Sequence, residues 1–269
     1  MVTDRIVVVT LDAHEVDDVT EAVVDLLGDG RGALVVAPAD PAAARAASAA
    51  AHRTGADLAV PDPATGRLRR QAPTDAVLDD LHRDEAEPWD VDGRWYEQRK
   101  RDLVAALLPR RRFAHGLEVG CSTGALAAVL AARCERLTAI DGSEHALARA
   151  RPRLAGVDHV ELRTGDVPDD WPEGRFDLVV CSEVGYFLSP SALERFAERV
   201  VATRTPDGVV VLAHWRHEMR GWPLDGPAVH RRLTDLVAPA GLTVQAVYRD
   251  ADVEMLLLGP PGSTPPPDA

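Results

Sequence analysis

An acidic residue and two glycines, spaced for a tight turn, form the segment of this sequence best suited to hold a ligand. The segment reads Leu-Glu-Val-Gly-Cys-Ser-Thr-Gly over residues 117–124. Gly120 and Gly124 suit a sharp turn, because glycine lacks a Cβ and lets a ligand approach the backbone closely. The N–H groups that open the next helix would face this ligand. The carboxylate of Glu118 beside them argues against a phosphate and favours a cationic or polar group.

Two further carboxylates follow the next two predicted strands. Asp141 lies 23 residues after Glu118, close to the offset of ~20 residues at which an acidic side chain meets ribose hydroxyls. Asp166 follows the next strand and suits a carboxylate that accepts from an adenine amine, with Val167 against the ring. The alternative for either aspartate alone is a turn or N-cap residue. Agreement at several strand ends favours an adenosine site.

The elements that would position these residues alternate regularly from residue 95 onwards. Predicted strands cover 116–119, 137–140, 159–163, 176–181 and 208–213, with a terminal strand pair at 242–248 and 253–258. Predicted helices cover 95–108, 123–134, 143–154 and 227–237, and another begins at 189–190. Ser143 is expected to cap the third helix, and the first is expected to be amphipathic, with Trp95, Tyr96, Leu103, Val104 and Leu107 on one broad apolar face. This order predicts an α/β fold with a Rossmann-like, mostly parallel sheet and an antiparallel last strand. Ligands of such sheets lie beyond the carboxyl ends of the strands.

The N-terminal part predicts a separate small unit. Apolar runs at 6–10, 33–36 and 57–60, with helical patterns between them, predict a βαβαβ arrangement without a Gly-rich phosphate loop. Residues 62–92 are rich in Pro, Asp, Arg and Glu and predict a linker with one short helix at 76–83. The expected division is 1–84, 85–259 and a disordered Pro-rich tail, 260–269. A homodimer contact, support for a lid and a remnant of a fused domain are three roles open to the first unit.

Composition excludes several classes of function. The formal net charge of −13 over 269 residues disfavours nucleic acid and anionic membranes as partners. The basic runs 99–101 and 110–112 are expected to be a solvated helix face and its end, and Lys100 is the only lysine. Three cysteines are too few for a disulfide framework. The start lacks a signal peptide and no apolar run reaches the ~20 residues of a membrane span, so a cytoplasmic protein is expected.

Five short segments together match a known pattern. They are Tyr-Glu-Gln-Arg-Lys at 96–100, the turn at 117–124, Trp-Pro-Glu-Gly-Arg-Phe-Asp-Leu at 171–178, Ser-Glu-Val-Gly-Tyr at 182–186 and His-Trp-Arg-His at 214–217. With them, the region from about 95 to 259 resembles the class I S-adenosylmethionine (SAM) methyltransferases, and more narrowly the nodulation-type NodS family of N-methyltransferases. Ser122 departs from the usual glycine of the turn. The first 85 residues have no counterpart in small family members, which leaves the acceptor open.

The resemblance implies S-adenosyl-L-methionine as cofactor and assigns a part of it to several residues. Glu118 would orient the amino group and Asp141 would hold the ribose. Arg99 would pair with the methionine carboxylate, although a solvent-facing position is its alternative. The implied cofactor residues are Tyr96, Arg99, Glu118, Gly120, Cys121, Ser122, Gly124, Asp141, Gly142, Asp166, Val167 and Ser182.

The resemblance also implies methyl transfer to an amino group on a small acceptor, an amino-sugar or chito-oligosaccharide. The acceptor side is expected in the loops after strands 176–181 and 208–213. Glu183 and His214 each follow a strand directly and are hypothesised to handle the amine, while Tyr186 would hydrogen-bond the acceptor or pack on the sulfonium. A hydrogen-bonded structural histidine is the alternative for His214.

Three other readings compete with this one. An O-methyltransferase acting on a sugar or secondary-metabolite hydroxyl would need a true general base. A catalytically silent SAM-binding scaffold would use the first 85 residues to bind a partner. A Rossmann dehydrogenase is disfavoured because Gly-x-Gly-x-x-Gly is absent. His214, His217 and His230 invite a metal site, but their spacing fits no recognisable ligand set, and no metal is predicted.

Overall fold

A seven-stranded mixed sheet forms the centre of the chain from residue 89 onwards. The computed structural model describes residues 89–217, 219 and 224–263, together with His82 and the backbone of four short N-terminal strands. The strands of the large sheet are β5 (Phe113–Val119), β6 (Cys134–Asp141), β7 (Val160–Thr164), β8 (Phe176–Ser182), β9 (Arg204–Trp215), β10 (Thr243–Arg249) and β11 (Val253–Gly259). Their order is β10-β11-β9-β8-β5-β6-β7. Only β11 runs antiparallel to its neighbours, β9 and β10, which confirms the predicted fold class.

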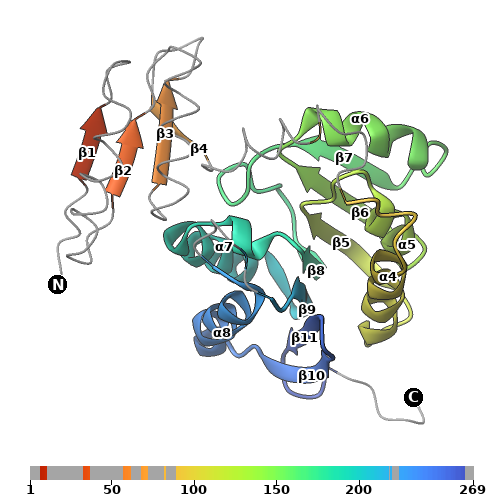
Figure 1. Ribbon diagram of the computed structural model, residues 1–269. Helices are drawn as coiled ribbons and strands as arrows, with labels where there is room; N and C mark the ends of the chain where they lie inside the picture. The colour runs from red at the N-terminus through yellow and green to blue at the C-terminus, as the bar shows by residue number, and fades with distance from the viewer. Residues whose placement is uncertain are drawn as a thin grey trace.

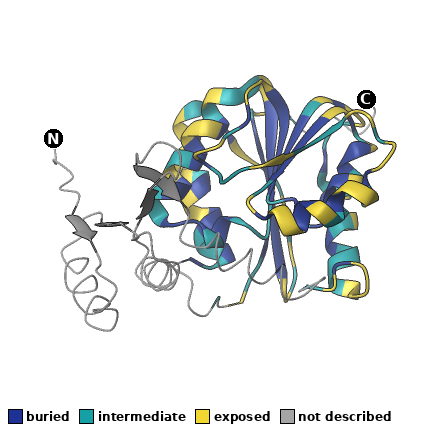
Figure 2. Ribbon diagram, turned by 90° about the horizontal axis from the view of Figure 1, so that it is seen from above, coloured by how far each residue is buried: buried dark blue, intermediate teal, exposed yellow. Residues whose placement is uncertain are grey.

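Helices cover both faces of this sheet (Figures 1 and 2). One face carries α4 (Trp95–Leu107), α5 (Ala125–Ala131) and α6 (Glu144–Arg153), and the other carries α7 (Pro190–Thr203) and α8 (Gly226–Val237). The central strands are buried on both sides, so β8 is apolar along nearly its whole length. Ser143 caps α6 as predicted, because its side chain accepts from the Ala146 N–H.

Two predicted elements differ from the structure. The helix predicted at 123–134 is shorter, because Gly124 adopts a left-handed conformation before α5 and Cys134 already begins β6. The apolar face predicted for α4 is also wrong in part. Trp95 is 69% exposed, whereas Lys100 is buried. The face of α4 that packs inward therefore contains an ion-paired lysine as well as apolar side chains.

The N-terminal strands form a sheet of their own. They are β1 (Val7–Thr10), β2 (Ala33–Val36), β3 (Asp57–Pro61) and β4 (Leu68–Gln71), in that order. The first three pair in parallel, as predicted, and β4 pairs antiparallel with β3. The prediction of a linker over 62–92 is thus wrong at β4. This segment forms a strand by pairing with β3, although its composition is poor in residues that favour strands. The helices predicted between these strands, most of the one at 76–83 and the tail beyond 263 lie outside the described residues.

The strand order reverses beside β5, and this position creates the crevice for a ligand. β6 and β7 lie on one side of β5, while β8 and β9 lie on the other. The turn after β5 packs closely against the loop after β8: a Cβ on Gly120, whose φ is 71°, would lie 1.9 Å from Cγ2 of Val184. Glycine is required there by both the backbone conformation and the space.

A buried histidine pair fixes the loop after β8. His214, near the end of β9, is fully buried, and its Nε2 accepts from the Gly185 N–H at 3.0 Å. Its Nδ1 lies 2.9 Å from Nε2 of His230 on α8. Because Nε2 accepts, neutral His214 carries its proton on Nδ1 and donates it to His230. The hydrogen bonds from Gly185 to His214 and from His214 to His230 hold the short 3-10 helix η1 (Gly185–Phe187) against the sheet.

The histidine pair predicts a specific loss of stability in acid. Burial, with the neighbouring His230, lowers the pKa of His214 to about 3, and burial lowers that of His230 to about 4. The unfolded chain therefore binds protons below about pH 6.5 that the folded chain does not bind. The free energy of unfolding should be insensitive to these groups above pH 6.5. It should fall by up to about 1.4 kcal/mol per pH unit for each histidine as the pH drops from 6 to 5.

Urea unfolding at pH 5.0, 6.0 and 7.0 measures this slope. His214→Gln removes one of the two titrating rings and keeps a polar side chain, so its slope between pH 6 and 5 should be smaller than that of the wild type by up to about 1.4 kcal/mol per pH unit. Carboxylates that titrate in the same range contribute equally to both proteins. Identical slopes would show that His214 does not stay neutral in the folded chain.

Candidate active site

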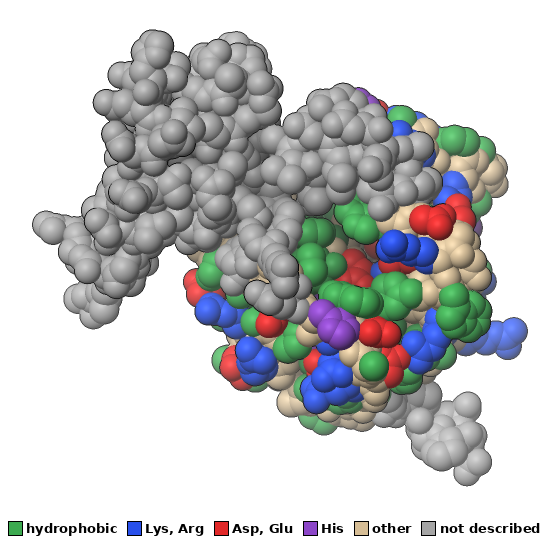
Figure 3. Space-filling view, in the orientation of Figure 1, with side chains coloured by type: hydrophobic (Ala, Val, Ile, Leu, Met, Phe, Trp, Pro, Cys, Tyr) green, Lys and Arg blue, Asp and Glu red, His purple; other side chains and the backbone are tan. Residues whose placement is uncertain are grey.

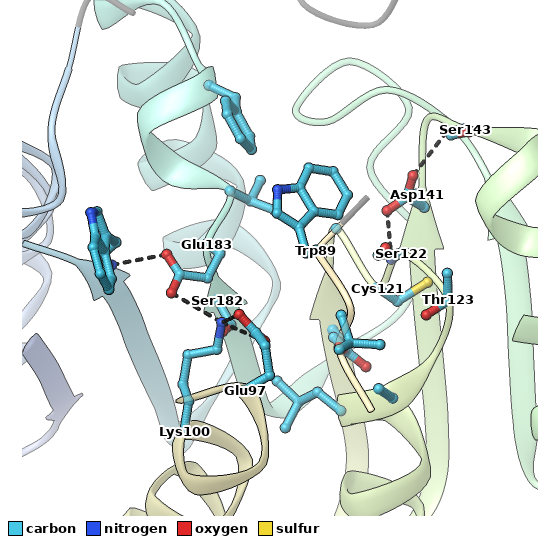
Figure 4. Close-up of a pocket in the computed structure, with 18 of the residues that line it drawn as sticks. Trp89, Glu97, Lys100, Cys121, Ser122, Thr123, Asp141, Ser143, Ser182 and Glu183 are labelled. Carbon is cyan, nitrogen blue, oxygen red and sulfur yellow. Dashed lines mark hydrogen bonds and ion pairs between the residues drawn. The ribbon is translucent and has the colours of Figure 1, made fainter. Parts of the chain in front are cut away.

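A pocket of about 650 Å³ lies at the carboxyl edge of the large sheet, where the strand order predicts a ligand site. Its walls come from the turn after β5, the ends of β6, β8 and β9, and one face of α4. Figure 4 shows two groups of polar side chains in it, one around Asp141 and one around Glu183. The pocket therefore has two chemically distinct halves.

The first half is built on two carboxylates. Asp141 is held by backbone donors: its Oδ2 accepts from the Ser122 N–H at 2.7 Å and its Oδ1 from the Ser143 N–H at 2.9 Å (Figure 4). Glu118 is only 2% exposed, and its Oε2 has no hydrogen-bond partner among the described residues. Burial, and then the charge of Asp141, raises the pKa of Glu118 well above its usual value. A cation bound beside Glu118 would stabilise its ionised form against both the burial and the negative charge of Asp141.

Most of the predicted cofactor residues line this pocket. They are Tyr96, Glu118, Gly120, Cys121, Ser122, Asp141, Gly142, Asp166, Val167 and Ser182. Gly124 is an exception: it does not line the pocket, although Thr123 and Ala125 on either side of it do. Its φ is 77°, and a Cβ there would lie 3.0 Å from that of Ala150, so this glycine serves the turn and the approach of α5 to α6.

Arg99, predicted to pair with the methionine carboxylate, lies outside the pocket. It donates to Asp250 at 2.6 Å and to the hydroxyl of Tyr248, and it does not line the pocket. Residues that are three or four apart share a helix face. On α4 the face towards the pocket carries Glu97, Lys100 and Arg101, and Arg99 lies off it.

The second half of the pocket is organised by one carboxylate with four donors. Oε1 of Glu183 accepts from the Tyr96 hydroxyl at 2.7 Å and from Nζ of Lys100 at 3.0 Å. Oε2 accepts from the Tyr186 hydroxyl at 2.7 Å and from the Trp215 N–H at 2.9 Å. A carboxylate offers about four acceptor sites, so these contacts saturate Glu183.

The protonation states of this half follow from its contacts. Burial raises the pKa of Glu183, but the Lys100 ammonium and the hydrogen-bond donors more than offset it, and the pKa lies below its ordinary value. Burial and the charge of Glu183 raise the pKa values of Tyr96 and Tyr186. At neutral pH, Glu183 is therefore a carboxylate and both tyrosines are hydrogen-bond donors.

Lys100 lines the pocket, although its sequence context did not predict a site residue. It was expected on a solvated helix face, but its side chain is 7% exposed and lies 2.9 Å from Glu97 and 3.0 Å from Glu183. A signal was present: this is the only lysine of the chain, and the other 29 of the 30 basic residues are arginines. The acidic residue three positions earlier, on the same helix face, was a second signal.

His82 and Trp89 line the pocket as well, from a stretch expected to be a linker. His82 is 2% exposed, its Nε2 lies 3.4 Å from the Ser122 hydroxyl, and its carbonyl accepts from Arg149. The rings of His82 and Trp89 meet edge to face at 4.9 Å. A tryptophan within a charged stretch was the one hint in the sequence.

The structure contradicts the predicted acceptor contact of His214. Both ring nitrogens are engaged with Gly185 and His230, and the side chain does not line the pocket. The hydrogen-bonded structural histidine is the alternative that the geometry supports. His217 pairs instead with Asp252 at 3.0 Å. Among the described residues, no three His, Cys, Asp or Glu side chains are grouped to hold a metal ion.

The surface adds two observations about partners. On the face shown in Figure 3, acidic and basic side chains of the described residues are interspersed rather than gathered into one basic patch. None of the helices in the described part of the chain is long and apolar enough to cross a membrane.

The cysteines at 121, 134 and 181 are free thiols, and all three are buried.

Comparison with known proteins agrees with this architecture. The family described as Nodulation protein S (NodS) matches residues 73–224, more than half of the chain. Nodulation protein S of Sinorhizobium fredii (strain NBRC 101917 / NGR234) is 36% identical over 135 residues, which are 49% of this chain and 62% of the relative. That of Rhizobium tropici is 38% identical over 112 residues, 41% of this chain and 47% of the relative. The matched regions thus span about half to two thirds of these relatives.

Among solved structures, N-methyltransferase NodS from Bradyrhizobium japonicum WM9, in complex with S-adenosyl-L-homocysteine (SAH), has a TM-score of 0.62 and 25% identity. The similarity covers 70% of this chain and 99% of that one. The sheet order, the acidic turn after β5 and the family match agree. This chain belongs to the NodS family.

Proposed function

We propose that this protein is a SAM-dependent N-methyltransferase that methylates an amino group of a small molecule, an amino-sugar or oligosaccharide. The observation that carries the proposal is the pairing of two anionic half-sites, around Glu118 and Glu183, in one pocket. The first suits the amino-acid and ribose parts of the cofactor, and the second suits an amine. The SAH complex of the NodS neighbour supports the cofactor.

The residues of the first half fit the cofactor. Glu118, buried with an oxygen that has no partner among the described residues, would accept from the cofactor's ammonium group. Asp141 would accept from the ribose hydroxyls, because its two backbone donors fix its orientation at the pocket wall. Asp166 and Val167, which line the same pocket, would hold the adenine.

Arg101, rather than Arg99, would pair with the methionine carboxylate. It lies on the pocket face of α4 and donates one N–H to the Val91 carbonyl. A guanidinium carries five N–H donors, so this bond leaves donors for the methionine carboxylate. Lys100, the buried cation of the helix, is held between Glu97 and Glu183 instead.

When bound, SAM supplies a methyl group that its sulfonium activates for in-line displacement. Glu183 would accept an N–H from a neutral acceptor amine and hold it so that the nitrogen lone pair faces the methyl carbon. The nitrogen–carbon bond forms as the carbon–sulfur bond breaks, and the electron pair of that bond stays on sulfur. The new ammonium then releases its extra proton to water. Tyr96 and Trp215, whose rings meet at 5.0 Å, form an aromatic wall beside this position.

The geometry favours an amine over a hydroxyl as acceptor. A hydroxyl needs a general base, and the histidine predicted on the acceptor side, His214, is buried and fully hydrogen-bonded away from the pocket. Glu183 is a weak base, because its pKa is lowered and its oxygens are already occupied. An amine needs only orientation, since it can bind with its lone pair free.

Turnover on a defined amine tests the proposed function. With labelled SAM, a tetramer of fully deacetylated glucosamine should gain methyl groups on its free amines, and the N-acetylated tetramer should gain none. Glu183→Gln should lower kcat/KM about 100-fold or more, because it removes the charge that holds the amine. Methylation of the N-acetylated tetramer would establish the hydroxyl acceptor. SAH binding without turnover on any amine would favour the silent scaffold.

The carboxylate of Glu118 predicts a pH-dependent cofactor affinity. Its raised pKa means that some of it is protonated in the free protein, and a bound ammonium group favours the ionised form. SAH affinity should therefore rise with pH over the range in which Glu118 of the free protein loses its proton, and binding should release a proton. Calorimetry in two buffers of different ionisation enthalpy measures that proton. Glu118→Gln should bind SAH more weakly and without proton release; unchanged proton release in this variant would rule out Glu118 as the linked group.

The two neighbouring arginines of α4 offer a matched comparison. Arg101→Met should weaken SAH binding about tenfold or more, because a charge-assisted contact to the methionine carboxylate contributes about 1.5–3 kcal/mol. Arg99→Met removes the same charge from the same helix but should change SAH affinity less than about twofold. Equal losses in the two variants would show that the net charge of the helix, and not Arg101, holds the carboxylate.

A further inference from the structure

The ammonium group of Lys100 and an amine acceptor require the same carboxylate oxygen. Oε1 of Glu183 accepts from Lys100 and Tyr96, and Oε2 accepts from Tyr186 and Trp215. Figure 4 shows the lysine reaching this carboxylate from α4, across the pocket from Asp141. Because Glu183 has no acceptor site left, an amine can reach it only by displacing one of the four donors.

Lys100 is the donor that the structure allows to leave. Trp215 donates through its backbone N–H, which is fixed within β9. Tyr186 is 5% exposed and belongs to η1, which the His214 contact holds in place. Lys100 alone among the four has a second carboxylate in contact, Glu97, at 2.9 Å. Its flexible four-carbon stem lets the ammonium move to Glu97 without losing a charged partner.

The position that Lys100 occupies has the features of an ammonium site. Its Nζ lies 5.0 Å from the centroid of the Tyr96 ring, within range of a cation–π contact. The same ring packs edge to face on Trp215. A carboxylate on one side and an aromatic face on the other attract any small organic cation, so an ammonium from an acceptor would find the same partners.

Building on the proposed function, we propose that Lys100 is an internal substitute for the acceptor's ammonium. It fills the amine subsite of Glu183 when no acceptor is present and retreats to Glu97 when a primary amine on a sugar enters as its ammonium form. That ammonium then loses one proton to water and becomes the neutral amine that receives the methyl group. Glu183 stays charge-balanced throughout the exchange, which avoids leaving a buried carboxylate without a counter-ion. A hydroxyl cannot replace the departing charge, so the exchange selects amines over hydroxyls.

The proposal predicts opposite effects for two variants, measured with the glucosamine tetramer on the SAM-loaded full chain. Lys100→Met keeps an unbranched side chain and removes the competing cation, so KM for the tetramer should fall about tenfold. Glu97→Gln removes the charge to which Lys100 retreats, so Lys100 should stay on Glu183 and KM should rise several-fold. Lys100→Arg, which keeps the charge, should not lower KM.

Several outcomes would overturn the proposal. A KM that rises or stays unchanged in Lys100→Met means that the lysine does not compete with the acceptor, and a shift in the same direction in both variants indicates a structural role. SAH affinity, measured in parallel, should stay close to that of the wild type in the lysine and glutamate variants. If the wild type binds SAH but methylates no amine, the proposed function fails as well; if it methylates the tetramer and the KM shifts are absent, only the exchange fails.

Discussion

The buried carboxylate of Glu183 is the constraint on which the acceptor side of this structure depends. A carboxylate removed from water is costly unless charged and hydrogen-bonding partners surround it. Here the partners come from three elements: Tyr96 and Lys100 from α4, Tyr186 from η1, and the Trp215 N–H from β9. Glu183 also has a φ of 58°, a conformation that costs a non-glycine residue free energy and persists where surrounding contacts hold it. The packing of α4 on the sheet is therefore coupled to the hydrogen bonding of the Glu183 carboxylate, because α4 supplies two of its four donors.

The two buried glutamates of the pocket show opposite electrostatic solutions. The protein supplies a full set of donors to Glu183, and its pKa is lowered although burial acts to raise it. Glu118 keeps an oxygen without a partner among the described residues, and burial raises its pKa. Within our proposal this difference has a purpose. A permanent counter-ion on Glu118 would compete with every cofactor molecule, whereas the counter-ion on Glu183 has a second carboxylate to which it can move.

Much of the fold, and the gathering of Glu118, Asp141 and Asp166 around one pocket, could be predicted from the sequence, because both follow from the geometry of parallel strands. Apolar runs locate the strands, and residues directly after them must gather at one edge. Which face such a residue presents depends on strand alternation, and this is where the prediction for His214 failed. It points with Leu212 and Val210 towards α8, while the next residue, Trp215, lines the pocket. A site residue is thus predicted only when both the edge and the face are known.

Helix faces and the start of the family region were harder to predict for a different reason. Apolar periodicity alone predicts Trp95 on the buried face of α4, but that face carries Lys100 instead. Burial of this lysine is favourable only because two carboxylates pair with its ammonium group. Composition similarly made residues 62–92 resemble a linker, although His82 contacts Ser122 and the family match begins at residue 73. Both observations favour a boundary nearer to the end of β4, at Gln71, than to residue 85. A stretch whose polar side chains are satisfied only by distant parts of the chain cannot be distinguished from a linker by local composition.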